Sequence, residues 1–302
     1  MRPILPIALV LCCAVWSVAA CAEASFRLGV INERPDRPSD ALKQYGPLND
    51  YLSRRLAERD ILVGDLFIGQ DLDEMAAAIE RGEVDALAEG VMPTLSIRRR
   101  SGTILPTLLL WRKGQRQYHA VFFARRDSAI QGLQDLRGRR IVFESPRSTS
   151  AYFLPLASMR AQGLHLTPSG APSSDPARVR YLFAGSELNQ AYWVQAGRAD
   201  AGAFNNGDWE RIPASVRQEL RIFGRTRSVL RWLLSFSTGL DVRIREAVIR
   251  VFLDMPEEAE GRVALEAAAR IARIERLTDA DRADLDYWSD VLGRLDRPDD
   301  AD

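Results

Sequence analysis

Apolar and polar residues alternate along the first third of the chain in blocks whose spacing switches between that of a strand and that of a helix. Residues 26–31 and 61–68 have the pattern of strands, and residues 84–88 form a third, shorter one. Between them, residues 47–59 and 72–81 carry apolar side chains at the spacing of amphipathic helices. Strands that alternate with helices at this interval predict a parallel sheet.

The pattern changes after residue 102 and then repeats. Two extended apolar runs, 103–110 and 118–125, are separated by a polar turn, where we expect the chain to cross into a second lobe. The second strand–helix unit comprises expected strands at 140–143, 179–183 and 199–204 and helices at 154–162 and 188–196. Residues 227–236 are apolar enough to form the return crossing.

The last part of the chain is predicted to be helical. Helices are expected at 241–253, 257–273 and 278–295, with Thr278 as the N-cap of the last. The expected organisation is therefore a leader at 1–20, one lobe from 21–116 plus 226–302, and a second lobe from 117–225.

One phrase occurs once in each expected lobe. Residues 79–86 and 194–201 both run from a helix through glycine, one further residue and an apolar residue to Asp-Ala. Gly82 and Gly197 are expected to end their helices, because glycine readily takes the left-handed conformation. Asp85 and Asp200 are expected to bond turn amides rather than a ligand.

The N-terminus has the features of a secretory signal, because residues 4–20 are apolar apart from Ser17 and follow a short basic start. Val18-Ala19-Ala20-Cys21 matches the bacterial lipobox, which predicts cleavage before Cys21 and lipid attachment there. Cleavage after Ala22 or Ala24, or an uncleaved anchor, are the alternatives. With Ala22 beside the cysteine, we expect a periplasmic protein anchored at the outer membrane.

Composition narrows the possible functions. The 302 residues include 41 basic and 41 acidic side chains, a balance that gives no electrostatic case for a nucleic-acid partner. Only Lys43 and Lys113 are lysines, so the many arginines indicate genome composition rather than phosphate recognition. Beyond the leader the chain keeps Cys21 and two histidines, which excludes disulfides, thiol nucleophiles and a zinc site. We therefore expect no cofactor and no metal.

The candidate chemistry is a run of three hydroxyl residues. Ser148, Thr149 and Ser150 follow the expected strand 140–143 and precede the next helix. Unpaired backbone N–H groups and the positive end of the helix dipole meet at such a position, which favours an anion. Three hydroxyls and these amides can satisfy three anionic oxygens without a fixed counter-charge. The alternative is an ordinary helix cap.

Several short sequence phrases before and after this run, taken in their order and spacing, are typical of one protein family. They are Leu28-Gly-Val30, Pro47-Leu-x-x-Tyr-Leu52, Gly82-x-Val-Asp85, Tyr118-His-Ala-Val-Phe-Phe-Ala-Arg-Arg-Asp-Ser128, Leu133-x-Asp-Leu-Arg-Gly-Arg-Arg-Ile-Val-Phe143, Ser148-Thr-Ser150 with Pro155, Phe183-Ala-Gly-Ser186, Gly197-Arg-Ala-Asp200, and Asp281 near Tyr287. In these phrases the chain resembles the phosphonate/phosphite-binding family of periplasmic solute-binding proteins that serve ABC importers. The resemblance implies a monomeric α/β clamshell of the type II periplasmic-binding class, with mixed sheets, flanking helices and a ligand cleft between two lobes. It also implies that Ser148, Thr149 and Ser150 bind the phosphonate oxygens and that an ABC permease is the partner.

The sequence departs from that family at acidic positions. Glu187 stands where the family often has histidine, and Glu89 occupies the equivalent loop of the first lobe. Ala151 replaces the usual glycine after the hydroxyl run. Two carboxylates facing a cleft would suit the amine of an aminophosphonate, whereas the alternative for each is a solvated residue at a helix start.

Three other side chains are candidates for the cleft. Tyr45 and Tyr118 are expected either to line it or to pack near the hinge. Asn205 follows the strand at 199–204, at the end where α/β sheets place ligands.

Three functions are compatible with these residues. The first is a solute-binding lipoprotein that delivers a small oxyanion to an ABC permease, closing by hinge motion near residues 115–118 and 224–228. The second is a ligand sensor of the same fold that signals to a membrane histidine kinase. The third is an enzyme that uses Glu89 and Glu187 as an acid–base pair, which ranks last because no nucleophile or metal set accompanies them.

Overall fold

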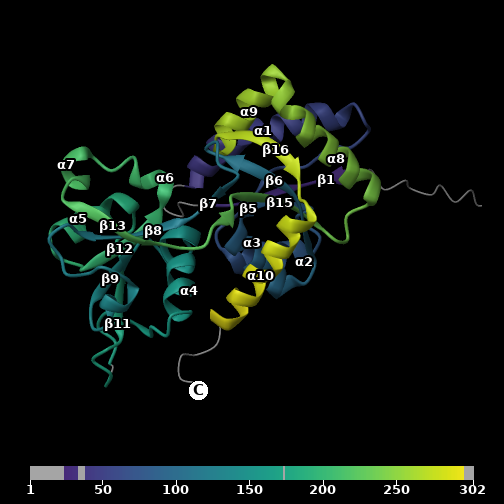
Figure 1. Cartoon of the computed structure of the whole chain (residues 1–302). Coiled ribbons are helices and arrows are strands. Elements are labelled where there is room, and N and C mark those ends of the chain that lie inside the picture. Colours follow the sequence, from purple (N-terminus) through teal and green to yellow (C-terminus); the bar gives the residue numbers. More distant parts are fainter. Residues whose placement is uncertain (1–23, 33–37, 173, 296–302) are drawn as a thin grey trace, which may run out of the picture.

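The computed structural model describes residues 24–32, 38–172 and 174–295; the expected leader and Cys21 lie outside this part. The chain forms two α/β lobes, each built around a six-stranded mixed sheet (Figure 1). Among the described residues, the sheet of lobe one is built from the N- and C-terminal parts of the chain, and the sheet of lobe two from the middle part.

Lobe one has the strand order β16-β6-β15-β5-β2-β4. Its strands are β2 Leu28–Ile31, β4 Phe67–Gly69, β5 Ala86–Gly90, β6 Ile104–Arg112, β15 Trp232–Ser237 and β16 Ile271–Arg276, and a short parallel pair joins β1 Ser25–Phe26 to β3 Leu62–Val63. Helices α1 Pro38–Ala57, α8 Val242–Asp254 and α9 Ala259–Ala269 pack on one face, and α2 Leu72–Glu80, α3 Val91–Ser101 and α10 Asp279–Leu295 on the other.

Lobe two has the strand order β10-β11-β9-β12-β8-β13. Its strands are β8 Ala120–Arg125, β9 Arg140–Phe143, β10 Leu166–Pro168, β11 Val179–Phe183, β12 Ala201–Asn205 and β13 Leu220–Arg225. Its helical segments are η1 Leu133–Leu136, the wide turn η2 Thr149–Phe153, α4 Leu154–Arg160, α5 Glu187–Gln195, α6 Asn206–Trp209 and α7 Ala214–Arg217. α4 covers one face of the sheet, and α5 and α7 cover the other.

The two sheets follow one plan. In each sheet three neighbouring strands are parallel and the next strand in the sheet is antiparallel to them. The parallel strands are β4, β2 and β5 beside β15 in lobe one, and β11, β9 and β12 beside β8 in lobe two. The repeated phrase of the sequence makes the same contact in each lobe. Asp85 accepts a hydrogen bond from the backbone N–H of Arg27 at 2.8 Å, and Asp200 accepts one from Arg140 at 2.8 Å. These contacts confirm the expected structural role of both aspartates.

Two chain segments connect the lobes. β7 Gln117–Tyr118 pairs antiparallel with β14 Val229–Leu230, so the outgoing and returning chains lie side by side. α10 packs on α3 of lobe one and also contacts α4 of lobe two (Figure 1). Arg160 of α4 donates a hydrogen bond to the carbonyl oxygen of Leu295 at 2.8 Å.

Three elements differ from the sequence prediction. α1 begins at Pro38, well before residue 47, and runs through Pro47. Residues 61–68 form parts of two strands, β3 and β4, because the chain leaves one pairing partner for another. The helix expected over 257–273 ends at Ala269: Arg270 takes a left-handed conformation, with φ of 54°, and the chain continues as β16 on the edge of β6.

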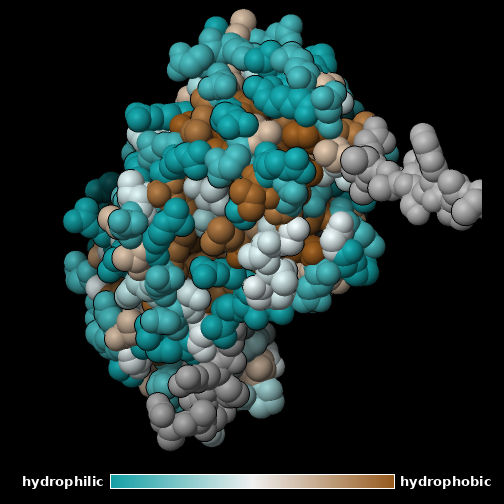
Figure 2. Space-filling view, turned by 90° about the vertical axis from the view of Figure 1, so that its right-hand side faces the viewer, coloured by the Kyte–Doolittle hydropathy of each residue, from teal (hydrophilic) through white to brown (hydrophobic). Residues whose placement is uncertain are grey.

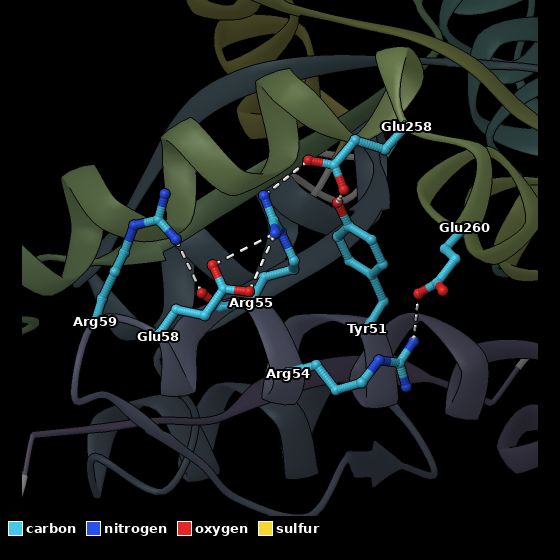
Figure 3. A network of polar contacts seen from close by, with 7 residues as sticks. All are labelled: Tyr51, Arg54, Arg55, Glu58, Arg59, Glu258 and Glu260. Atoms are coloured by element: carbon cyan, nitrogen blue, oxygen red, sulfur yellow. Dashed lines mark hydrogen bonds and ion pairs between the residues drawn. The ribbon is translucent and has the colours of Figure 1, made fainter.

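A polar network fastens α1 to the segment between α8 and α9 (Figure 3). The Tyr51 hydroxyl donates to a carboxylate oxygen of Glu258 at 2.7 Å, and the Arg55 guanidinium contacts the other oxygen at 2.8 Å. Arg55 also pairs with Glu58 at 3.1 Å. Burial and the Glu258 carboxylate raise the pKa of Tyr51 to about 12, so this hydroxyl remains a donor at all ordinary pH values.

The surface shown in Figure 2 is mostly hydrophilic, with separate hydrophobic patches among the polar side chains. Across the part of the chain that the structure describes, no helix has both the length and the apolar character needed to cross a membrane.

Candidate functional site

A cleft of about 440 Å³ lies between the lobes. Lobe one and the crossings line it with Ile31, Asn32, Leu72, Glu89, Gly90, Pro93, Arg112, Lys113, Tyr118, Arg231 and Trp232, and lobe two with Glu144, Ser145, Arg147, Ser148, Thr149, Ser150, Gly185, Ser186, Glu187, Asn205 and Asp208. A second hollow of about 470 Å³, on lobe two near Trp209 and Arg217, contains none of the predicted site residues.

The fold explains why these residues meet. β2 and β5 of lobe one and β9, β11 and β12 of lobe two all end at the cleft, which is where open α/β sheets bind ligands. Helices α3 and α5 also begin there, so their first backbone N–H groups lie at its walls. Helix starts on both walls favour a negatively charged ligand.

The hydroxyl run forms the start of the wide turn η2. Ser148 is its N-cap, and its Oγ accepts the N–H of Ala151 at 3.1 Å. Thr149 and Ser150 are almost buried, with 9% and 8% of their surfaces exposed. Because Ser148 also lines the cleft, the structure combines the two interpretations of this run, a helix cap and a cleft wall. The Ser148 hydroxyl proton remains available as a donor.

The lobes approach each other closely at Thr149. A Cβ atom added to Gly90 of lobe one would lie 3.7 Å from Thr149 Oγ1 and 3.6 Å from Trp232 Nε1. Gly90 is the N-cap of α3. The hydroxyl run of lobe two therefore faces the helix start of lobe one across the narrow part of the cleft.

All but one of the predicted binding residues line the cleft: Ser148, Thr149, Ser150, Tyr118, Glu187, Glu89 and Asn205. Tyr45 is not among the lining residues. Only 2% of its surface is exposed, and its ring stacks on Trp232 with a centroid distance of 6.5 Å and an interplanar angle of 12°. Tyr45 thus supports a cleft residue from the core of lobe one.

The acidic candidates come from opposite lobes. Glu89 lies near the end of β5 and accepts the N–H of Gly90 at 2.6 Å. Glu187 begins α5 beside its N-cap Ser186, whose Oγ accepts the N–H of Asn189 at 3.2 Å. The Asn205 side chain is held by a local hydrogen bond, because its oxygen accepts the N–H of Asp208 at 3.1 Å.

Tyr118 lies where the outgoing crossing enters the cleft. Its side chain is buried, and burial raises the pKa of its hydroxyl, while the nearby Arg231 charge and a hydrogen bond with Thr149 oppose the rise. The hydroxyl is therefore protonated at neutral pH.

Sequence reasoning missed the positive charges of the cleft. The Arg112 guanidinium lies 4.3 Å from the centre of the Trp232 ring, and Arg231 lies 4.1 Å from that of Tyr118. Lys113 Nζ is 3.8 Å from Asp208, and burial lowers the pKa of Lys113. The cleft therefore contains cations in addition to the hydroxyls and amides that the sequence indicates. Composition does not distinguish these cations from the other basic residues of the chain. Only their positions at the ends of the crossings identify them as cleft residues.

In the described ranges, His, Cys, Asp and Glu side chains do not gather in groups of three or more that could hold a metal ion.

Two α/β lobes of one plan, joined by paired crossings and enclosing a cleft at the ends of their parallel strands, define a type II periplasmic binding protein. Residues 33–282 match the model of the family described as "ABC transporter, phosphonate, periplasmic substrate-binding protein", and the chain belongs to that family. The family resemblance seen in the sequence is thereby confirmed.

Known relatives agree with this assignment. The chain is 33% identical over 86 residues to the phosphate-import protein PhnD of Mycolicibacterium smegmatis, a match that spans 28% of this chain and 26% of that protein. A solved structure of XAC2383 from Xanthomonas citri bound to chloride ion has a TM-score of 0.81 and 30% identity, covering 90% of this chain and 98% of that one. None of these matches favours the sensor alternative.

A more distant relative shares the fold. The methylphosphonate complex of PhnD1 from Prochlorococcus marinus has a TM-score of 0.64 and 18% identity, covering 91% of this chain and 100% of that one. The family is a substrate-binding component of transporters, which accords with the low rank given to an enzymatic role.

Proposed function

We propose that this protein is the periplasmic binding component of an ABC importer and that it carries a phosphonate-like oxyanion in its interlobe cleft. One observation carries the proposal: Ser148, Thr149 and Ser150 form a helix start that lines a cleft between two lobes. Hydroxyls and free helix-start amides at one point provide donors for the three oxygens of a phosphonate head.

The strength of such a site is sufficient for uptake. Hydrogen bonds to a charged group contribute roughly 1.5–3 kcal/mol each. Several of them together support a dissociation constant in the micromolar range or below, which requires about −8 kcal/mol. Tyr118 and the cleft cations reinforce the preference for an anion.

The acidic residues narrow the ligand class. Glu89 and Glu187 line the cleft from opposite lobes, and Glu144 joins them. Carboxylates on both walls would accept the amine of a zwitterion, so we propose an aminophosphonate as the preferred ligand. The known relatives extend the candidates to phosphate and methylphosphonate, and to ATP, which is bound in a second structure of the Xanthomonas citri protein.

We propose that the lobes divide at residues 116/117 and 225/226, close around the ligand as a monomer and present it to an ABC permease. We further propose that signal cleavage before Cys21 leaves a lipid on this cysteine, holding the protein at the outer membrane. Replacing Cys21 by serine would then release the protein from membranes, whereas unchanged partitioning would exclude lipidation there.

A ligand panel tests the binding proposal. Phosphate, phosphite, methylphosphonate, 2-aminoethylphosphonate and ATP are titrated into the purified mature protein by calorimetry. We expect at least one phosphorus oxyanion to bind with micromolar or tighter affinity, and 2-aminoethylphosphonate to bind more tightly than methylphosphonate. If no member of the panel binds, the proposed function is wrong; if methylphosphonate binds more tightly, only the amine contact is wrong.

A further inference from the structure

Arg231 is a buried cation on the returning crossing. It lies between β14 and β15, and its backbone N–H donates to the carbonyl oxygen of Arg116 on the outgoing crossing at 2.9 Å. Only 5% of its surface is exposed, and this residue lines the cleft. The guanidinium therefore sits at the hinge between the lobes, with its accessible part toward the ligand site.

The surroundings of Arg231 leave its charge incompletely compensated. Its guanidinium lies 4.1 Å from the Tyr118 ring centre, and the negative charge of Asp208 acts on it without forming an ion pair. Its buried Nε has no hydrogen-bond partner in the part of the chain that the structure describes. Within that part, no carboxylate forms an ion pair with Arg231 in the way that Asp208 does with Lys113 at 3.8 Å. A buried charge in this state is costly, because burial removes its water.

The charge of Arg116, at the start of the other crossing, is compensated by two carboxylates. Its Nε contacts Glu275 at 2.7 Å and its Nη2 contacts Asp281 at 2.8 Å. The backbones of these two hinge arginines are hydrogen-bonded to each other, but their side chains differ. Arg116 forms direct ion pairs with two carboxylates, whereas Arg231 has an aromatic ring, the cleft and only the more distant charge of Asp208.

We propose that Arg231 is the charge-recognition residue of the cleft and that the bound oxyanion supplies its missing partner. This inference rests on the proposed function, in that the cleft binds an oxyanion, and adds which residue selects the charge. The guanidinium presents a planar fork of donors that suits phosphorus oxyanions. Because Tyr118 and Arg231 lie on the two paired crossings, the ligand's charge is neutralised at the hinge itself.

The role implies a specific pair of phenotypes. Removing the charge of Arg231 should weaken anion binding without weakening the ligand-free fold, since an uncompensated buried charge is lost. Removing the charge of Arg116 should do the reverse, because it leaves Glu275 and Asp281 without their partner while the cleft stays intact. Arg116→Gln is therefore the matched control for Arg231→Gln.

The test compares wild type, Arg231→Gln, Arg231→Lys and Arg116→Gln. Calorimetry measures the affinity for the best oxyanion of the panel, and thermal unfolding measures the stability of each ligand-free protein. We expect Arg231→Gln to lose at least about thirty-fold in affinity with an unchanged or raised Tm, the range for truncating one member of a buried charged pair. Arg231→Lys should fall between Arg231→Gln and wild type in affinity. Arg116→Gln should bind like wild type and melt at a lower temperature.

Two results overturn the inference. One is an Arg231→Gln protein that binds the oxyanion like wild type. The other is an Arg231→Gln protein whose ligand-free Tm falls as far as that of Arg116→Gln, which would make Arg231 a structural residue. Failure of the proposed function gives a different pattern, because wild type would then bind no phosphonate. In that case phosphate, sulfate and chloride serve as probes: stabilisation of wild type but not of Arg231→Gln supports the inference, and no stabilisation of wild type overturns it.

Discussion

Arg147 of lobe two donates a hydrogen bond from its guanidinium to the carbonyl oxygen of Gln70 in lobe one, at 3.2 Å. Gln70 follows β4 and Arg147 follows β9, so the contact joins two loops at the strand ends beside the cleft. Lys113 and Asp208 make a second contact between the hinge turn and lobe two, at 3.8 Å. The lobes thus touch at the margin of the cleft as well as at the crossings.

Replacing Arg147 by alanine should speed ligand release. The contact with Gln70 is exposed, so its loss should cost the closed arrangement about 1 kcal/mol, which corresponds to a release rate about five-fold higher. The association rate of an anion should fall modestly, because Arg147 is also a cation on the cleft wall. Stopped-flow fluorescence, with Trp232 of the cleft wall as the reporter, would measure both rates.

Arg137→Ala is the control for this change. Arg137 is an exposed arginine of the same lobe, and its guanidinium bonds only within that lobe, to Gln134 at 3.2 Å and to the Gly163 carbonyl at 3.5 Å. It should release ligand at the wild-type rate. Equal release rates in the Arg147→Ala and Arg137→Ala proteins would mean that the Arg147 contact has no part in closure.

Glu187→Gln should separate ligands with an amine from those without one. The substitution removes a negative charge from the cleft wall while keeping the shape of the side chain. We expect 2-aminoethylphosphonate to bind up to about five-fold more weakly and methylphosphonate to bind more tightly, since the repulsion of its anion is relieved. Calorimetry on both ligands measures the difference, and a change of the same sign and size for both would dismiss the amine contact.

Tyr51→Phe should change how stability depends on pH. The pKa of Tyr51 rises from 10.0 to about 12 in the folded protein because of burial and its hydrogen bond to Glu258. A raised pKa stabilises the fold fully below pH 10, and this stabilisation is lost as the pH rises through about 12. Two pKa units correspond to at most about 2.7 kcal/mol.

The measurement is urea unfolding of wild type and Tyr51→Phe between pH 7 and 12. At pH 7 the variant should be less stable by about 1–3 kcal/mol, the contribution of a hydrogen bond to a charged group. The difference should narrow above pH 10. A difference that stays constant to pH 12 would show that Tyr51 ionises at the same pH in the folded and unfolded chain.

The sequence predicted the parts of the fold that depend on local pattern. The strand at Arg140–Phe143, the helix start at Ser148 and the N-cap Thr278, which accepts the N–H of Asp281 at 3.2 Å, all depend on residues close in sequence. The strand β16 was missed because the alanine-rich residues before it favour a helix. Its strand character comes from pairing with β6, far away in the chain.

The cleft could be predicted only in part for the same reason. Ser148, Thr149 and Ser150 stand out as a run, and Glu187 and Glu89 stand out as departures from a family pattern. Arg231 has no such mark among the many arginines, and its importance depends on the Tyr118 ring and on the absence of a carboxylate partner within the described chain. Both are properties of the packed structure.

The hydroxyl run is proposed to bind an oxyanion between the lobes. The most direct test of this claim is the calorimetric affinity of the best panel ligand for wild type and for the Ser148→Ala, Thr149→Ala double variant. Loss of two hydrogen bonds to a charged group should weaken binding by at least about 100-fold, with the fold preserved by circular dichroism. A double variant that binds this ligand as tightly as wild type would contradict the claim.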